Sequence, residues 1–482
     1  MITFCTGILI LILGYLFYSK YIEKLFGPDD RPTPANSLTD GVDFIHLSRK
    51  RNCLIQLLNI AGLGPIIGAL QGILFGPVAF LLIPAGCIFM GGVHDYFSGM
   101  ISVRNNGIQV TELIKKYLGK NSYRVSVFLF SLMLLIVATV FVYMSGDIIA
   151  QRFFGQNDFS LNNPVIVGIY LVIAFYYILA TMFPIDKIIG KIYPLFAILL
   201  LLGTGLVFLG FFTHGIRLTE INFSNINLHP DKLPIVPFFF MTVSCGLLSG
   251  FHSTQATIVS RTLNSEKDGR KVYYGMMTLE SLIGMIWAAA AMHVYNNEIL
   301  NPNFIGTANA INSIADIFVP YVLTFVVTVA VVILPITSGD TALRGLRMTI
   351  ADALKINQKP IKNRLMVILP LAFGMFGILS WAKLNSESFG LIWRYFNFTN
   401  QLIAIPTFLV ATVYLKNEGK NYFVTLIPGL LYIFFTMTFI FNAKIGFGQN
   451  ILVAEIIALF ITFMGYLFVK NATKKYADKC DE

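Results

Sequence analysis

Residues 59–68 read Asn-Ile-Ala-Gly-Leu-Gly-Pro-Ile-Ile-Gly. They lie in the middle of residues 53–76, an apolar segment long enough to cross the hydrocarbon core of a bilayer, which takes about 20 residues of helix. Gly62 and Gly64 weaken a helix at this point, and Pro65 removes a backbone N–H donor. Non-helical backbone survives at such a depth only where protein buries it or where it lines a water-filled cavity. The pattern predicts a membrane helix that is broken halfway.

A second apolar segment, residues 234–258, is interrupted in the same way. Residues 244–254 read Ser-Cys-Gly-Leu-Leu-Ser-Gly-Phe-His-Ser-Thr. For either segment alone the alternative is close helix packing, since Gly and Ser also let helices approach one another. Interrupted segments at matching positions of two halves are, however, the best sequence pointer to a transporter site. The pair therefore favours a solute carrier.

The composition places the chain in lipid. Of its 482 residues, 56% are hydrophobic and 12% are charged, whereas soluble domains average about a quarter charged. We therefore predict an all-α polytopic membrane protein with about 13 transmembrane helices. The predicted spans are residues 2–19, 53–76, 77–103, 125–149, 163–183, 188–213, 234–258, 272–295, 318–336, 365–381, 390–415, 421–442 and 451–469.

Lysine and arginine alternate between the predicted loops. One set of loops, taken with the C-terminal tail, carries 29 of them and the opposite set carries five. Because cytoplasmic loops collect Lys and Arg, the N-terminus is expected outside and the C-terminus in the cytoplasm of a bacterial-type plasma membrane. The net charge of +10 is then a topology signal and not a nucleic-acid surface. The five cysteines are scattered and predict neither disulfides nor a metal site.

The two interrupted segments suggest an internal repeat. Each opens a set of five predicted helices, over residues 53–233 and 234–415, and because five is odd the second set runs inverted. A helix and a loop precede the sets in residues 1–52, and two helices and a tail follow in residues 416–482. This arrangement resembles the LeuT-like fold of amino acid–polyamine–cation transporters, with one extra N-terminal and two extra C-terminal helices.

The LeuT resemblance implies a substrate site between the two breaks. The Leu63 and Gly64 amides would face a substrate carboxylate at the positive end of a half-helix. The substrate-binding residues expected from both breaks are Asn59, Gly62, Leu63, Gly64, Pro65, Ser244, Ser249, Gly250 and His252.

The same resemblance implies a cation site. Thr337 and Ser338 follow Leu334 at helical spacing and so share a face with its carbonyl. This is similar to the second sodium site of the LeuT fold, to which Leu58 and Ala61 would add carbonyl groups. Oxygen ligands suit a hard cation. The alternative is that the two hydroxyl residues end the helix before the next glycine.

Several blocks in order over residues 44–404 resemble the carbon starvation protein A (CstA) family, whose members take up peptides or pyruvate. The blocks are Ile-Ala-Gly-Leu-Gly-Pro-Ile-Ile-Gly at 60–68, Gly-Gly-Val-His-Asp at 91–95, Ser-Val-Arg at 102–104, Cys-Gly-Leu-Leu-Ser-Gly-Phe-His at 245–252, Asp-Thr-Ala-Leu-Arg-Gly-Leu-Arg at 340–347 and Asn-Gln-Leu-Ile-Ala at 400–404. The chain departs from the family pattern at Ile55 and Gln56, where two His are usual, and at His94, where Gln is usual.

Ionisable residues inside spans are costly and point to function. Asp95 is the best candidate for ion or proton handling. His94 beside it is a candidate for proton relay, because histidine titrates near neutrality. The alternative is an internal ion pair of Asp95 with Arg344 or Arg104. His252 follows the second break, where the alternative to a role in transport is an ordinary hydrogen-bonded core histidine.

Further polar residues are expected to pack or gate the helices. Asp340, Arg344 and Arg347 begin the predicted loop after the ninth span, where a gate is more plausible than substrate contact. Asn400 and Gln401 are expected to hydrogen-bond across helices. Among the ionisable residues within spans, Glu280 and Asp147 are candidates of lower rank for a functional role.

These features together predict secondary active transport of a small carboxylate or short peptide by alternating access. A Na⁺ or H⁺ gradient is expected to drive it, since the sequence has no Walker motif for nucleotide binding. The alternatives are a channel or nutrient sensor on the same fold, or an intramembrane metal-dependent enzyme. No cofactor or metal is expected; the partners are the solute and the lipid bilayer, with no nucleic acid, and the oligomeric state is left open.

Overall fold

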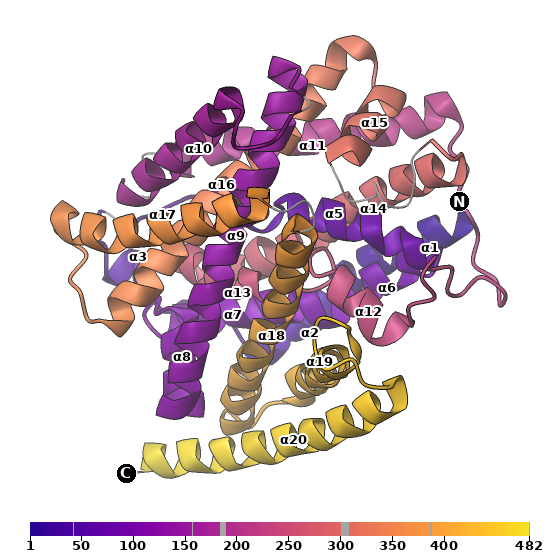
Figure 1. Ribbon diagram of the computed structural model, residues 1–482. Coiled ribbons are helices and arrows are strands. Elements are labelled where there is room, and N and C mark those ends of the chain that lie inside the picture. Colours follow the sequence, from indigo (N-terminus) through magenta and orange to yellow (C-terminus); the bar gives the residue numbers. More distant parts are fainter. Residues whose placement is uncertain (42, 157, 184–188, 300–307, 385–387, 482) are drawn as a thin grey trace.

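Helices make up the regular structure of this protein (Figure 1). The computed structural model describes every residue except 42, 157, 184–188, 300–307, 385–387 and 482. Within that described part there is no β-strand, only an isolated bridge between Leu47 and Leu263. The predicted all-α membrane fold is confirmed.

The first part of the chain runs through peripheral helices and then the first broken helix. Its helices are α1 (Ile2–Leu13), η1 (Gly14–Tyr18), α2 (Ser19–Phe26), α3 (Pro34–Ser37), α4 (Arg49–Ile60), α5 (Leu63–Gly72), η2 (Ile73–Phe75), α6 (Ala79–Gly86), η3 (Cys87–Gly91), α7 (Gly92–Arg104), α8 (Val110–Leu118), α9 (Lys120–Phe154), α10 (Pro164–Met182) and α11 (Ile189–His214).

The second part opens on the second broken helix and ends in three long helices. Its helices are α12 (Ile235–Thr242), α13 (Phe251–Val259), η4 (Glu266–Asp268), η5 (Arg270–Tyr274), α14 (Gly275–Asn296), α15 (Ala308–Phe318), α16 (Tyr321–Ala353), α17 (Ile361–Leu384), α18 (Ser388–Asn417), α19 (Phe423–Asn442) and α20 (Ile451–Asp481).

Eleven described helices are long and apolar enough to cross a membrane, or twelve if the bent pair of α4 and α5 counts as one span. The difference from the thirteen predicted spans lies at residues 234–258, where α12 and α13 are short helices separated by eight residues. The five-plus-five inverted repeat, and the division of the chain that follows from it, stay predictions.

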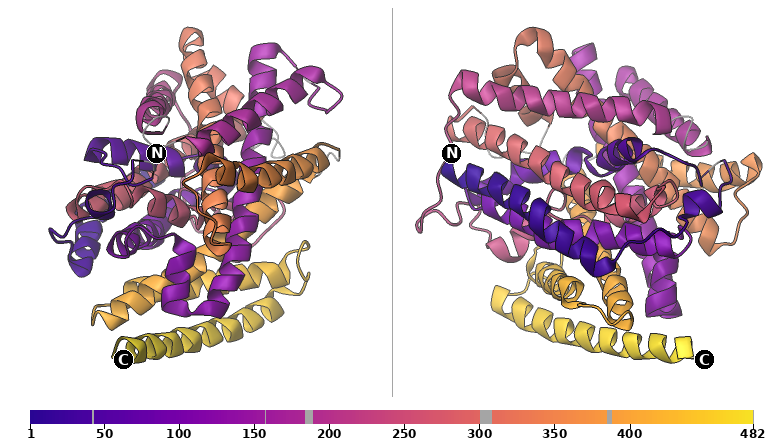
Figure 2. Two further views of the ribbon diagram at one scale, coloured as in Figure 1. Left: turned by 90° about the vertical axis from the view of Figure 1, so that its left-hand side faces the viewer. Right: turned by 180° about the vertical axis from the view of Figure 1, so that it is seen from behind.

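Burial separates the centre of the bundle from its periphery. The apolar stretch of α18 is 83% buried and that of α14 is 78% buried, whereas only 11% of that of α20 is buried. Figure 1 shows α20 lying across the outside of α18 and α19, and Figure 2 shows α1 on the far side running beside α14. The two broken helices pack against α14, α16 and α18 and therefore lie in the protein interior.

The ninth span is longer than the sequence suggests. The sequence predicts its end at residue 336, but α16 continues without interruption to Ala353. Thr337 and Ser338 therefore do not end the helix, and Asp340, Arg344 and Arg347 lie in a helix and not in a loop. The reason is that these polar side chains are buried and bonded to neighbouring helices, so the helix does not stop where the apolar residues do.

Candidate functional site

The first broken helix is interrupted at Ala61 and Gly62. Ala61 has φ −79° and ψ 58°, and Gly62 has φ −72° and ψ −157°, so neither continues α4. Pro65 lies in the first turn of α5, where backbone N–H groups have no partner within the helix and its missing donor costs little. The two halves are bent by 51° relative to each other.

The second broken helix is held open by α18. Residues 243–250 are not helical, and Gly246 takes φ +80°, a conformation that favours glycine. Asn400 accepts hydrogen bonds from Ser249 Oγ at 3.1 Å and from the Phe251 backbone N–H at 2.8 Å. Its Nδ2 donates to the Ser244 carbonyl at 3.1 Å. Asn400 thus satisfies backbone groups that the break leaves without helical partners.

Two further contacts fix the same segment to α18. Gln401 donates from Nε2 to the Phe240 carbonyl at 2.8 Å, and Ser244 Oγ donates to Asn397 Oδ1 at 2.5 Å. The hydroxyls of Ser244 and Ser249, both expected at a substrate site, therefore bond to asparagines of α18. Asn400 and Gln401 hydrogen-bond across helices to the broken segment.

The two breaks lie directly against each other. A Cβ atom at Gly64 would lie 2.6 Å from Cys245 Sγ, and one at Gly246 would lie 3.6 Å from Pro65 Cβ. Gly284 of α14 also packs against the first break, since a Cβ there would lie 3.2 Å from the Pro65 carbonyl oxygen. Of the predicted substrate residues, Gly64 and Pro65 of the first break thus meet Cys245 and Gly246 of the second, and all nine predicted residues are buried.

Two of the expected cation residues, Ser338 and Leu58, meet beside the first break. Ser338 Oγ donates to the Leu58 carbonyl at 3.4 Å, and a Cβ at Gly62 would lie 2.8 Å from Ser338 Oγ. Thr337 Oγ1 lies 3.0 Å from the Leu334 carbonyl. Ser338 thus contacts the last turn of α4, whereas the Thr337 hydroxyl bonds to carbonyl groups of its own helix.

The residues predicted to gate or pack α16 fasten it to α10 and α11. Tyr176 donates to Asp340 Oδ2 at 2.7 Å, and Tyr193 OH contacts Asp340 Oδ1. Arg344 donates to the carbonyls of Ala180 and Phe183, and Arg347 Nε donates to Thr181 Oγ1 at 3.2 Å, all at the end of α10.

Asp95 of α7 lies between two histidines. Its Oδ1 is 2.9 Å from Nδ1 of the neighbouring His94, and its Oδ2 is 3.0 Å from Nδ1 of His252 in α13. The other ring nitrogen of His252 is 3.6 Å from Glu280 Oε1 in α14. That oxygen accepts a hydrogen bond from the Gly246 backbone N–H at 3.3 Å. A row of buried polar groups therefore runs from α7 to the second break.

The arginine partners expected for Asp95 in an internal ion pair are wrong, because Asp95 faces His94 and His252 instead. Arg104 donates to Glu266, and Arg344 donates to backbone carbonyls, so neither pairs with Asp95. Glu280, a candidate of lower rank from the sequence, lies in this polar row. The signal for it is that it is the one acidic residue within residues 272–295.

Two side-chain amides of α4 lie in the interior without partners. Gln56 and Asn59 are fully buried, and none of their four amide N and O atoms has a hydrogen-bond partner among the described residues. Asn59 is an expected substrate residue and Gln56 is not. Asn52, near the start of α4, bonds to Thr262, which follows the end of α13. Gly64, which follows α4, faces Cys245, which precedes α13. The two helices are therefore antiparallel, and the last two turns of α4 lie beside α13. Unpaired buried amides are costly, so they require an explanation.

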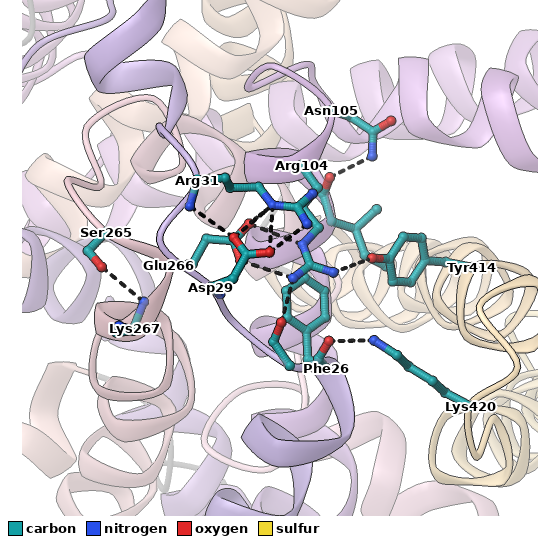
Figure 3. A network of polar contacts seen from close by, with 12 residues as sticks. Phe26, Asp29, Arg31, Arg104, Asn105, Ser265, Glu266, Lys267, Tyr414 and Lys420 are labelled. Atoms are coloured by element: carbon teal, nitrogen blue, oxygen red, sulfur yellow. Dashed lines mark hydrogen bonds and ion pairs between the residues drawn. The ribbon is translucent and has the colours of Figure 1, made fainter.

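A network of polar contacts surrounds Arg104 (Figure 3). Arg104 donates to Glu266 Oε1 at 3.1 Å and Oε2 at 3.0 Å, and its Nη1 donates to Tyr414 OH at 2.9 Å. Arg31 donates hydrogen bonds to Asp29 beside it and holds the pKa of that carboxyl well below its usual range. The network joins α2, α7, η4 and α18.

Nothing in the described part of the chain brings three His, Cys, Asp or Glu side chains together in a way that would hold a metal ion. The polar row at Asp95 consists instead of imidazoles and carboxylates that face one another in pairs. What this arrangement can do is hold and move a proton.

The helical bundle has the fold of membrane transporters. Crystal structures of two mutants of the Eremococcus coleocola manganese transporter match 91% of this chain and 99% of their own, with TM-scores of 0.55 and 0.54. Their sequence identity of 10% supports the fold alone.

The family model described as Carbon starvation protein CstA matches residues 1–155, 142–317 and 304–439. The chain therefore belongs to the CstA family, as its sequence blocks predicted. An "Uncharacterized membrane protein" of Haemophilus influenzae is 39% identical over 62% of this chain and 92% of its own. The "Peptide transporter CstA" of Bacillus subtilis is 23% identical over 97% and 95%, and the "Pyruvate/proton symporter BtsT" of Escherichia coli is 25% identical over 58% and 47%.

Proposed function

We propose that this protein is a secondary active transporter that imports a small carboxylate or short peptide by alternating access. The observation that carries the proposal is that two helices break at the same place in the interior and face each other there. Backbone N–H and C=O groups that have no helical partner at this depth are suited to bind a polar solute. The names of the relatives, a peptide transporter and a pyruvate/proton symporter, support the same substrate classes.

The solute binds between the breaks in this proposal. No side chain caps the start of α5, so the amides of Leu63 and Gly64 are available to a carboxylate at the positive end of that helix. Gln56 and Asn59 add donors and acceptors that have no partner among the described residues. A peptide, which carries both donors and acceptors, satisfies more of these groups than pyruvate, which offers acceptors alone.

Two routes for coupling follow from the geometry. The oxygens of Leu58, Ala61, Leu334, Thr337 and Ser338 would hold Na⁺ beside the first break. The row formed by His94, Asp95 and His252 would instead hold a proton.

The proposed orientation places the N-terminus outside and the network of Figure 3 at the cytoplasmic face, where the loops rich in Lys and Arg lie. In this orientation Asp340, Arg344 and Arg347 hold the inner half of α16 to α10. Alternating access requires some of these contacts between helices to change.

Counterflow in proteoliposomes tests the proposal. Purified protein is reconstituted with pyruvate, alanine, dialanine or trialanine inside, and uptake of the labelled solute is followed while Na⁺ and pH are varied separately. Saturable counterflow of at least one solute is expected. Ohmic conductance would indicate a channel instead, and absence of flux for all of them would contradict a carrier for these solute classes.

A further inference from the structure

We propose that Glu280 transmits protonation to the second break, and that H⁺ is therefore the coupling ion. This inference rests on the proposed transport function. Glu280 is the member of the buried polar row that contacts both the imidazole of His252 and the backbone of the broken helix.

The positions of the atoms leave a place for one proton. His252 presents Nδ1 to Asp95 Oδ2 at 3.0 Å and Nε2 to Glu280 Oε1 at 3.6 Å. A neutral imidazole donates from one nitrogen and accepts at the other. When Nδ1 donates to Asp95, Nε2 and Oε1 are two acceptors facing each other. A proton taken from water and bound at Glu280 turns this pair into a donor and an acceptor, and its release restores the carboxylate.

The ionisable groups around Glu280 are imidazoles, a carboxylate and thiols. The titratable groups that face it are His252 of α13, Asp95 of α7 with His94 behind it, and the thiol of Cys87 in η3, while the thiol of Cys245 in the break contacts His252. Among the described residues no Lys or Arg forms an ion pair with Asp95 or Glu280.

The site therefore contains two carboxylates and two imidazoles, all fully buried. Asp95 contacts both imidazoles, and Glu280 contacts that of His252. Separate ionised groups at this depth are costly, and interacting groups titrate as a unit. A proton that enters at one member of the row therefore changes the charge on the others.

The same carboxylate holds the backbone of the second break. Its Oε1 accepts the Gly246 N–H at 3.3 Å, and Gly246 lies against Pro65 of the first break. Hydrogen bonds to an ionised carboxylate are roughly twice as strong as those to a neutral acceptor. Protonation of Glu280 therefore loosens residues 243–250 at the contact between the breaks, where the solute is proposed to bind. This links the proton to the conformation of the site.

The test compares Glu280→Gln with wild-type protein in proteoliposomes loaded with dialanine or pyruvate. Accumulation driven by an acid exterior is expected to fall by about tenfold or more in the variant, a coupling effect of ordinary size, and counterflow at equal pH on both sides is expected to fall by clearly less than that. Glu280→Asp, which keeps a carboxylate, is expected to retain driven accumulation with a shifted pH profile. Glu455→Gln in α20 is the matched control and is expected to behave as wild type.

Three outcomes overturn the inference. They are driven accumulation by Glu280→Gln equal to that of wild type, loss of counterflow together with accumulation in Glu280→Gln, and accumulation by wild type that follows Na⁺ and not pH. An absence of counterflow by wild-type protein with every solute contradicts the proposed function itself, so the two failures are distinguishable.

Discussion

The side-chain oxygen of Asn400 accepts a hydrogen bond from the Phe251 backbone N–H at 2.8 Å, so a residue of α18 caps the first turn of α13. Gly250, the residue before the helix, provides no side-chain cap of its own. We expect Asn400→Ala to lower the stability of the protein by about 1–2 kcal/mol, the usual cost of a lost cap, and further because the Ser249 hydroxyl and the Ser244 carbonyl lose their partner.

Thermal unfolding in detergent measures the effect of Asn400→Ala. Asn417→Ala is a suitable control, because the Asn417 side chain bonds within its own helix, to the Val413 carbonyl at 2.8 Å. Equal melting temperatures for the two variants would show that Asn400 does not support the break.

The contact between the breaks predicts an effect of added volume. A Cβ at Gly64 would lie 2.6 Å from Cys245 Sγ, so Gly64→Ala forces the two broken helices apart. We expect counterflow to fall by about tenfold, which corresponds to about 1.4 kcal/mol. Gly377→Ala in α17 is the control, since no atom lies within 4 Å of a Cβ there. Counterflow by Gly64→Ala at the wild-type rate would place the solute elsewhere.

The breaks could be predicted from the sequence because their cause is local. Gly62, Gly64 and Pro65 interrupt a helix through their own backbone properties, and Gly246 does so in the second segment. Most span positions were predictable for the same reason, since a helix in lipid must be apolar along its own length.

The partners of the buried charges were not predictable, because they lie far away in the chain. Asp95 bonds to a histidine 157 residues later, and Asp340 to a tyrosine 164 residues earlier. A prediction from hydropathy ends a span at the first charged residues, because it takes no account of partners on other helices. For this reason the predicted span ends before Asp340, whereas α16 continues to Ala353. The burial of Gln56 with no partner for its amide among the described residues was not predictable either, because it depends on how distant helices pack around α4.

The proposed cation site predicts a specific loss of Na⁺ response. Ser338 Oγ and the Leu58 carbonyl are 3.4 Å apart beside the first break. Na⁺ bound there is the alternative to H⁺ coupling, and Ser338→Ala would then raise the Na⁺ concentration for half-maximal counterflow at fixed pH by about tenfold, or about 1.4 kcal/mol. Thr341→Ala, whose hydroxyl bonds within α16, should leave that concentration unchanged. A wild-type rate that ignores Na⁺ would remove the cation site from the proposal.

The network of Figure 3 predicts a large cost for losing one charge. Glu266 is fully buried, and Arg104 donates two hydrogen bonds to it. Arg104→Gln leaves that carboxylate without its main partner, and breaking a buried pair in this way typically costs about 3–5 kcal/mol. Lys267→Gln breaks an exposed pair with Asp30 and should cost at most about 1 kcal/mol. Similar melting temperatures for both variants would contradict a structural role for the network.

The unpaired amides of Gln56 and Asn59 predict opposite changes in stability and transport. A buried amide without a partner destabilises the solute-free protein by about 1–3 kcal/mol. Gln56→Leu should therefore raise the melting temperature or leave it unchanged. If the amide bonds to the solute, the same substitution should raise the KM for dialanine by about tenfold, because the solute loses a hydrogen-bond partner in a buried site.

Gln401→Leu distinguishes this role from ordinary packing. The Gln401 amide already donates to the Phe240 carbonyl at 2.8 Å, so its removal leaves a buried acceptor unpaired and should lower the melting temperature. A residue that only packs loses stability when it is replaced, whereas a residue kept for the solute loses affinity. A Gln56→Leu protein that melts earlier than wild type and transports dialanine with an unchanged KM would assign Gln56 to packing.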